Sequence, residues 1–342
     1  MELIRIPNRP PHWDELIRRY DTKVLFHESA WHDHLLTIHR GGRIEYFELA
    51  DQGRTVGYFC AFAVRKFLLS IYGSPLPGTG TNYMGPIVNR ELDLGKFLEA
   101  LVRMCKRNRV AHLELSHDWL EPVVMTNLGF AMHPNVTHVA PLPESEAAGW
   151  ALLRSECRNR IRKAEKNGLR AELTSDPSIV DHYYDQFTEV YAKQGMVPPW
   201  SRERPRSLFE CLLPAGRILP VWVKHRDTVV ATGLFPFDER CVFFWGAASW
   251  LKYQDLCPNE LLHWTVMRLA IARQISLYNM CGGTSQFKNK FGGSDVPYVH
   301  YSRSFFPLLE AGRRGYEYLH RKKLRVLGLL RRSGVGLKAG MG

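Results

Sequence analysis

Two lysines lie within a twelve-residue stretch that has a glycine pair at each end, 282-GGTSQFKNKFGG-293. Read as a β-strand, this stretch places alternate side chains on opposite faces. One face then carries Thr284, Gln286, Lys288 and Lys290, and the other carries the two phenylalanines. The lysines would then form a cationic surface aimed at an anionic group of a ligand. The alternative is an edge strand whose lysines only discourage sheet-to-sheet aggregation.

A second cationic element is the helix predicted for 150-WALLRSECRNRIRKAEKNGL-169, which Asn167-Gly168 would end. Apolar residues at helical spacing predict a buried stripe: Leu153, Cys157, Ile161 and Ala164. Another face carries a ladder of like charges: Arg154, Arg158, Arg162 and Lys166. Because arginine presents forked donors that match phosphate, a phosphorylated ligand would offset the repulsion within this ladder. We therefore expect Arg158, Arg162 and the adjacent Lys163 to bind substrate phosphate, with a solvated helix surface as the alternative.

The composition narrows the class of protein. A chain of 342 residues with 45% hydrophobic residues is long enough for two globular domains. Its net charge of +12 favours an anionic partner, which could be a nucleic acid, a phosphorylated substrate or an acidic membrane surface. The seven cysteines are scattered without a CxxC pair, which is typical of a reducing compartment and signals neither zinc nor disulfides.

Other kinds of site receive little support. The fourteen histidines are dispersed and form no HExxH motif, so we predict no metal. Asp238 and Glu239 lie in a predicted turn, where we expect them to be solvated, and no general base is assigned. The N-terminus has no signal-peptide core, and no apolar run approaches the roughly 20 residues of a membrane-spanning helix. We therefore expect a cytoplasmic protein.

The two halves of the chain repeat one order of elements. The first half predicts a hairpin, a Gly/Pro-rich loop, a helix and a strand at residues 44–67, 73–86, 95–110 and 111–117. The second half predicts a hairpin, a loop, a helix and a strand at residues 217–249, 252–259, 260–274 and 275–283. This repetition predicts a duplicated unit of mixed α/β class, joined by a linker at residues 141–150.

The segments RNRIRKAEKNG and GTSQFKNKFGG, together with 24-VLFHESAWHDHL-35, resemble the FemABX-type branch of the GNAT acyltransferase superfamily. The resemblance spans residues 24–305 and implies tandem GNAT-like domains, each a mostly antiparallel mixed sheet flanked by helices. We expect an N-terminal domain at 1–145, a C-terminal domain with the FK motif at 146–305, and a basic helix or tail at 306–342.

The resemblance implies transfer of an acyl or aminoacyl group to an amine on a phosphorylated small-molecule or lipid-linked cell-envelope precursor, as in peptidoglycan and cell-wall synthesis. The donor would be aminoacyl-tRNA or acyl-CoA as a co-substrate, and no cofactor is expected. The matching catalytic positions are Phe287 and Lys288, and in the family this lysine stabilises the reacting carbonyl. Further substrate-binding candidates are Trp31, His27, Tyr83, Gln286 and Ser285. A surface histidine at position 27 and a core tryptophan at position 31 are the alternatives.

Two other functions stay open. The first is an acyl-CoA-dependent N-acyltransferase in polysaccharide or secondary-metabolite biosynthesis, whose basic tail would contact the anionic inner face of a membrane. Against it, 252-KYQDLCPNELL-262 has no glycine and 77-PGTGTNYMGP-86 has glycines in the wrong order for a pyrophosphate-binding loop. The second is a non-catalytic nucleic-acid-binding protein, although no known nucleic-acid-binding motif is present. The oligomeric state is left open.

Overall fold

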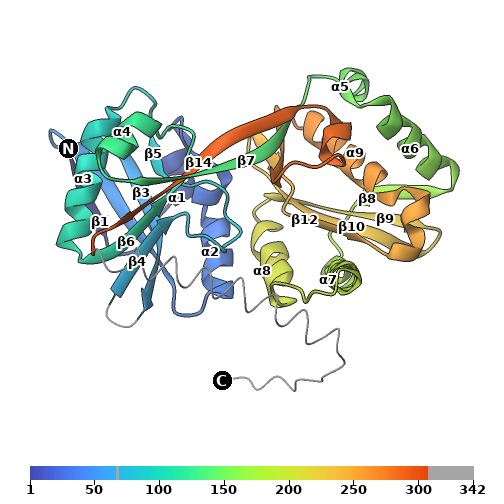
Figure 1. The fold of residues 1–342 in the computed structure, drawn as a ribbon, viewed down its shortest axis with the longest axis horizontal. Helices are drawn as coiled ribbons and strands as arrows, with labels where there is room; N and C mark the ends of the chain where they lie inside the picture. The colour runs from blue at the N-terminus through green and yellow to red at the C-terminus, as the bar shows by residue number, and fades with distance from the viewer. Residues whose placement is uncertain (67–68, 307–342) are drawn as a thin grey trace, which may run out of the picture.

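The computed structural model describes residues 1–66 and 69–306, which form two units side by side (Figure 1). The first unit contains β1 (Glu2–Ile6), α1 (Trp13–Arg18), η1 (Leu25–His27), α2 (Ser29–Ile38), β2 (Arg43–Asp51), β3 (Arg54–Lys66), β4 (Leu69–Ser74), β5 (Pro86–Val88), α3 (Leu94–Arg107), β6 (Val110–Leu115), α4 (Pro122–Asn127) and β7 (Ala131–Pro141). Of the expected tail at 306–342, residue 306 is described and residues 307–342 lie outside the described residues.

The second unit begins with α5 (Glu146–Leu152) and α6 (Ser155–Lys166). It continues with β8 (Leu169–Leu173), α7 (Ser178–Lys193), α8 (Glu203–Leu212), β9 (Ile218–His225), β10 (Thr228–Pro236), β11 (Cys241–Phe243), β12 (Gly246–Ser249), η2 (Leu251–Leu256), α9 (Pro258–Ile271), β13 (Leu277–Gly282), η3 (Lys288–Phe291) and β14 (Ser294–Ser304). The expected tandem of GNAT-like mixed α/β units, each mostly antiparallel and flanked by helices, is confirmed.

Local sequence explains the hairpins and helices of both units. The β2–β3 turn uses Gln52 and Gly53, both with positive φ, as a tight two-residue connection requires. In α3, Asp93 caps the first turn by accepting from the Lys96 amide at 3.0 Å, and Phe97 lies on the buried face. The basic helix also forms, but it begins at Ser155 because the chain is extended at the preceding arginine.

Strand exchange ties the two units together. β14, the last strand of the described chain, lies between β6 and β7 and is antiparallel to both. β7 also pairs with β13, so one ten-stranded sheet runs from the first unit into the second. In Figure 1, β7 and β14 are the long strands that run between the units. β14 therefore falls within the expected range 146–305, but its hydrogen bonds complete the sheet of the first unit.

The sheets separate between β11 and β12. β11 pairs in parallel with β13 at an edge of the ten-stranded sheet, whereas β12 pairs with β10 at an edge of the four-stranded sheet β12-β10-β9-β8. The chain passes from one sheet to the other at Phe244 and Trp245, and the Phe244 amide still donates to the Asn279 carbonyl at 2.9 Å. This divergence opens space at the junction of the units.

The prediction of a strand between the two glycine pairs is wrong. Residues 284–287 form a loop, and Lys288–Phe291 form the short 3₁₀ helix η3. Phe287 has helical backbone angles, and its ring lies 5.3 Å from that of Phe291, four residues on. Both rings contact the buried His263, at 5.2 and 5.1 Å between ring centroids. Phe287 and Phe291 therefore follow helical spacing, because their packing against the hydrophobic core of the second unit outweighs the alternating pattern.

Candidate active site

Two cavities meet at the junction of the units. The smaller one, about 130 Å³, lies between the glycine-rich loop of the first unit and the β11–β12 crossover, and is lined by Trp31 and Trp245 among others. The larger one, about 490 Å³, lies over β7, β13 and β14 and is lined by Tyr83 and charged residues. Phe243 lines both cavities, so the two spaces are neighbours with one shared wall.

A hydrogen-bonded wall joins the units between these cavities. The Asn279 side-chain oxygen accepts from the Cys281 amide at 2.8 Å and from the Thr137 hydroxyl at 2.6 Å. The Asn279 amide group donates to the Tyr83 hydroxyl at 3.1 Å, and Asn82 donates to the Cys281 sulfur at 2.9 Å. The glycine-rich loop is thereby fixed on the end of β13, where the two spaces adjoin.

Lys288 lies behind this wall and is 9% exposed. Its ammonium donates to the carbonyls of Cys281 at 2.6 Å, Gly282 at 2.5 Å and Gly283 at 2.9 Å. Burial lowers the pKa of Lys288. The lysine thus places a cation at the carboxyl end of β13, next to the cysteine that lines the smaller cavity. All three of its hydrogens are directed at backbone carbonyls, so a reacting oxygen would have to replace one of these acceptors.

The other residues of the FK motif support η3. Phe287 packs against the hydrophobic core of the second unit, and the Ser285 hydroxyl accepts from the Lys288 amide at 3.3 Å. Gln286 is exposed. Within the described chain none of these three lines either cavity. Ser285 and Phe287 therefore position the lysine through the backbone of η3.

Three candidates from the first unit lie at the junction. Trp31 is fully buried, donates to the Thr81 hydroxyl at 3.0 Å and lines the smaller cavity. Tyr83 lines the larger cavity, and burial raises its pKa. His27 is also fully buried: its Nδ1 accepts from the Val24 amide at 3.1 Å, and its Nε2 lies 3.3 Å from the Gly85 carbonyl. The surface-histidine alternative is therefore wrong, and burial holds the pKa of His27 well below its ordinary value.

The basic helix α6 lies on the side of the second unit remote from the first (Figure 1). Arg158 folds back to donate to the Leu153 carbonyl, Arg162 lies 5.4 Å from the Trp150 ring centroid, and Lys163 is exposed. None of the three lines either cavity among the residues that the structure describes.

Lys290, not Lys288, connects η3 to α6. Its carbonyl accepts from the Arg154 amide at 3.0 Å, and its ammonium lies 3.2 Å from Glu156. The helix residues that we expected to bind substrate phosphate therefore lie apart from both cavities and from the FK lysine. Helix periodicity predicted which residues share a face, but it could not predict that this face points away from the junction.

A buried carboxylate occupies the first turn of α9. Glu260 is 4% exposed and lies 3.4 Å from the Arg160 guanidinium and 3.3 Å from the Lys290 ammonium. Helix N-termini bind anions because their amides and dipole favour negative charge. Here the chain's own carboxylate occupies the helix start and pairs with two cations of the chain. This result strengthens the argument made from the missing glycines.

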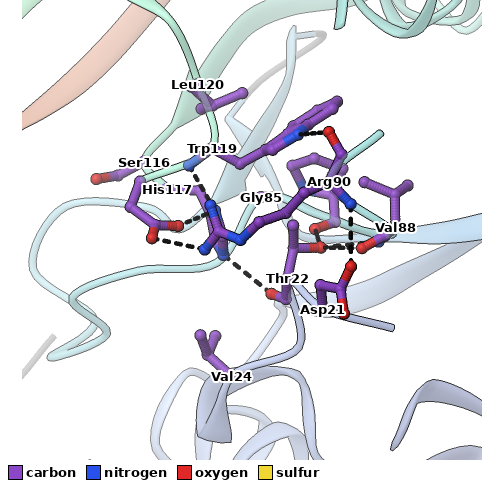
Figure 2. Close-up of polar contacts among 12 residues, drawn as sticks. Asp21, Thr22, Val24, Gly85, Val88, Arg90, Ser116, His117, Trp119 and Leu120 are labelled. Atoms are coloured by element: carbon purple, nitrogen blue, oxygen red, sulfur yellow. Dashed lines mark hydrogen bonds and ion pairs between the residues drawn. The ribbon is translucent and has the colours of Figure 1, made fainter. Parts of the chain in front are cut away.

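Sequence reasoning missed the polar network of the larger cavity. Arg90 lies 2.7 Å from Asp118, whose other oxygen is 2.9 Å from His117 Nδ1, and His117 Nε2 donates to the Thr22 carbonyl at 2.9 Å. Figure 2 shows Thr22, Arg90 and His117 close together in this network. Burial alone would raise the pKa of Asp118, but the hydrogen bond with His117 lowers it overall. These residues come from separate loops, so no spacing in the sequence signals them.

The turn that contains Asp238 and Glu239 also contributes to the larger cavity. Asp238 is 5% exposed and accepts from the Leu25 amide at 2.7 Å, so the expectation that it is solvated is wrong. Lys23 contacts Glu28 and lies 2.7 Å from Glu239. Arg240 donates to the Asp21 carbonyl at 3.2 Å. No carboxylate of the described chain lies within ion-pair distance of Arg240, which makes it a cation available to an anionic ligand.

Residues 152–289 match the family model of the GNAT acetyltransferase domain. Among solved structures, FemX is similar with a TM-score of 0.69 and 13% identity, over 87% of this chain and 97% of that chain. The C-terminal domain of a putative lysylphosphatidylglycerol synthetase from Agrobacterium fabrum is similar with a TM-score of 0.54 and 10% identity, over 84% and 89% of the two chains. A tandem GNAT protein from the clavulanic acid biosynthesis pathway gives a TM-score of 0.51 and 10% identity, over 90% and 99%.

Comparison with curated proteins gives no match. The structural similarities, all at low identity, concern the fold, and the sequence match covers the unit that contains the β11–β12 crossover and Lys288. No helix within the described residues is long and apolar enough to span a membrane. The chain therefore resembles the GNAT acetyltransferase domain in sequence over residues 152–289, and it resembles FemX and a tandem GNAT protein in fold over most of its length.

Proposed function

We propose that the chain is an N-acyltransferase that moves an acyl or aminoacyl group onto an amine at the junction of the two units. The observation that carries this proposal is the pair of neighbouring cavities beside the β11–β12 crossover, in the unit that matches the GNAT domain. Two adjacent spaces suit a reaction that joins two substrates, because each can hold one reactant close to the shared wall.

The crossover offers a binding surface for an extended donor. β12 has a strand partner on one side only, since it ends the four-stranded sheet. Exposed strand edges bind extended ligands through backbone hydrogen bonds. A donor arm on this edge would bring its carbonyl toward Trp245 and the smaller cavity.

Lys288 is the proposed source of positive charge for the transition state. Its ammonium is held by three carbonyls at the end of β13, behind the wall of the smaller cavity, and a developing oxyanion would replace one of these carbonyls as its acceptor. Loss of one preorganised donor of this kind lowers the rate by roughly 10²–10³. The acceptor amine would transfer its proton to substrate phosphate or water.

Aminoacyl-tRNA is the donor that we propose first, and acyl-CoA is the alternative. The buried Glu260 opposes a pyrophosphate at the start of α9, which disfavours the usual binding mode of CoA. The acceptor would be a phosphorylated or lipid-linked precursor of the cell envelope, held in the larger cavity by Arg240. A cytoplasmic location, with contact at the anionic inner face of a membrane, belongs to the same proposal.

A transfer assay tests the proposal directly. Purified protein is incubated with an amine acceptor mixture and either labelled aminoacyl-tRNA or labelled acyl-CoA, and label in the acceptor is measured. Arg240→Gln should raise the acceptor KM about tenfold or more, because a charge-assisted hydrogen bond is worth roughly 1.5–3 kcal/mol. Arg158→Gln on α6 is the matched control and should leave the KM unchanged. No transfer from either donor, with duplex DNA binding retained, would instead favour the nucleic-acid-binding alternative.

A further inference from the structure

The smaller cavity combines aromatic walls with one partly buried guanidinium. Arg204, at the start of α8, lies 5.0 Å from the Trp200 ring centroid and donates to the Gly78 carbonyl at 3.1 Å. Its Nε is buried and has no hydrogen-bond partner. No carboxylate in residues 1–66 or 69–306 lies within ion-pair distance of it. A partly buried cation with an unpartnered Nε and no counter-charge is unfavourable, so a purely structural role leaves it unexplained.

The other polar groups around this cation are also hydrogen-bond donors or neutral. The Trp200 indole N–H is buried without a partner. The amide of Asn82 already donates to the Cys281 sulfur. His34 and His39 lie nearby, and burial, followed by the charge of Arg204, lowers the pKa of each ring, so neither supplies negative charge. The cavity therefore presents a cation and an unpartnered indole N–H against aromatic walls.

The approach of the guanidinium depends on a glycine. A Cβ on Gly80 would lie 2.7 Å from Arg204 Nη2 and 3.5 Å from the Trp245 indole nitrogen. Gly80 also has a φ of +77°, which side chains rarely adopt. The loop thus leaves open the space in which the guanidinium and an indole N–H face the cavity.

We infer that this cavity binds the carboxylate of a substrate group with a small apolar or aromatic body. The inference rests on the proposed function, because it assigns one substrate group of that reaction. A carboxylate matches the forked donors of arginine and balances its single charge, whereas a phosphate dianion would leave a negative charge buried among aromatic rings. The volume of about 130 Å³ suits one ring, since an engineered cavity of roughly 150 Å³ takes benzene.

Binding of benzoate to the full chain tests the inference without any transfer assay. Titration is followed by tryptophan fluorescence, because three indoles line the cavity. Benzamide is the neutral isostere and phenyl phosphate the dianion, and sodium chloride at equal ionic strength is the salt control. Benzoate should bind at least about tenfold more tightly than benzamide, since a hydrogen bond to a charged group is worth roughly 1.5–3 kcal/mol. Benzoate should also bind more tightly than phenyl phosphate.

Two variants on α8 separate binding from structural support. Arg204→Met should abolish the preference for benzoate over benzamide while the melting temperature stays equal or rises, because a partly buried charge without a partner is removed. Arg206→Met is the control: this arginine is exposed and pairs with Asp181, so benzoate binding should not change. Equal binding of benzoate and benzamide to the natural chain, tighter binding of phenyl phosphate, or unchanged binding in Arg204→Met would overturn the inference.

Transfer kinetics then identify which substrate carries the carboxylate. Benzoate that competes with the donor assigns the carboxylate to the transferred group, and benzoate that competes with the acceptor assigns it to the acceptor. A chain that binds benzoate as described but transfers nothing would refute the proposed reaction while retaining the carboxylate site.

Discussion

Replacement of Lys288 by methionine separates structural from catalytic roles of the FK lysine. The change removes three hydrogen bonds to consecutive carbonyls and keeps most of the side chain's length. Gly282 and Gly283 are exposed, so water can replace the ammonium at their carbonyls, whereas the Cys281 carbonyl lies at the partly buried wall. One poorly satisfied carbonyl costs about 1–3 kcal/mol, and the two rehydrated bonds add a smaller loss. We expect the free energy of unfolding to fall by roughly 2–4 kcal/mol.

Thermal and urea unfolding measure this loss. At about 2 °C per kcal/mol for a chain of this size, the melting temperature should fall by about 4–8 °C. Lys163→Met is the control, because this lysine is exposed on α6, and the change should stay within about 0.5 kcal/mol. Below its melting transition, Lys288→Met should still transfer acyl groups roughly 10²–10³ more slowly than the natural chain. A variant that melts with the natural chain would refute the structural argument, and one with full transfer activity would refute the catalytic one.

Three further changes test other parts of the structure. Gly80→Ala should weaken benzoate binding and destabilise the chain by about 1–3 kcal/mol, because the new methyl group would meet the Arg204 guanidinium. Gly78→Ala is the control, since this glycine has a similar φ but open space around it. In the same titration and melting experiments, Gly78→Ala should show only the cost of backbone strain. Glu114 is buried, and although burial alone would raise its pKa, hydrogen bonds from two histidine rings lower it to about 2. Because the folded-state pKa is depressed, its contribution to stability is present above the ordinary value of 4.5 and is lost as the pH falls toward 2; Glu114→Gln should flatten that limb of the stability curve in urea titrations. Glu260→Ala leaves Arg160 and Lys290 paired with the exposed Glu156, so it should lower stability by about 1–3 kcal/mol in low salt and be partly rescued by pyrophosphate. A stability unaffected by either would contradict the charge balance described there.

Local patterns in the sequence determined most of the elements. The Gln52-Gly53 turn and the Asp93 cap are chain-neighbour signals, and the hairpin and helix they mark form as expected. The stripe that begins at Leu153 and Cys157 is buried, as its helical spacing indicates. These features depend on interactions within a few residues, which a sequence displays directly.

Features set by distant contacts could not be read in the same way. The alternation around Lys288 favoured a strand, but the preference of Phe287 and Phe291 for one aromatic core produced a helical turn. The lack of a counter-charge for Arg204 among residues 1–66 and 69–306 is invisible in sequence, because acidic residues occur throughout the chain and only the fold shows which of them come near. The FK lysine and the cavity tryptophan were identified by resemblance, and their catalytic and binding roles stay predictions.

The insertion of β14 has a consequence for how the chain acquires its structure. During synthesis, residues 1–141 leave the ribosome well before residues 294–304, so β6 and β7 first exist without the strand that separates them. Until then the nascent sheet exposes hydrogen-bonding edges that could recruit other chains. Maturation of the N-terminal half must therefore wait for nearly the whole polypeptide, and a gene divided between the halves would yield two fragments that each lack part of their sheet.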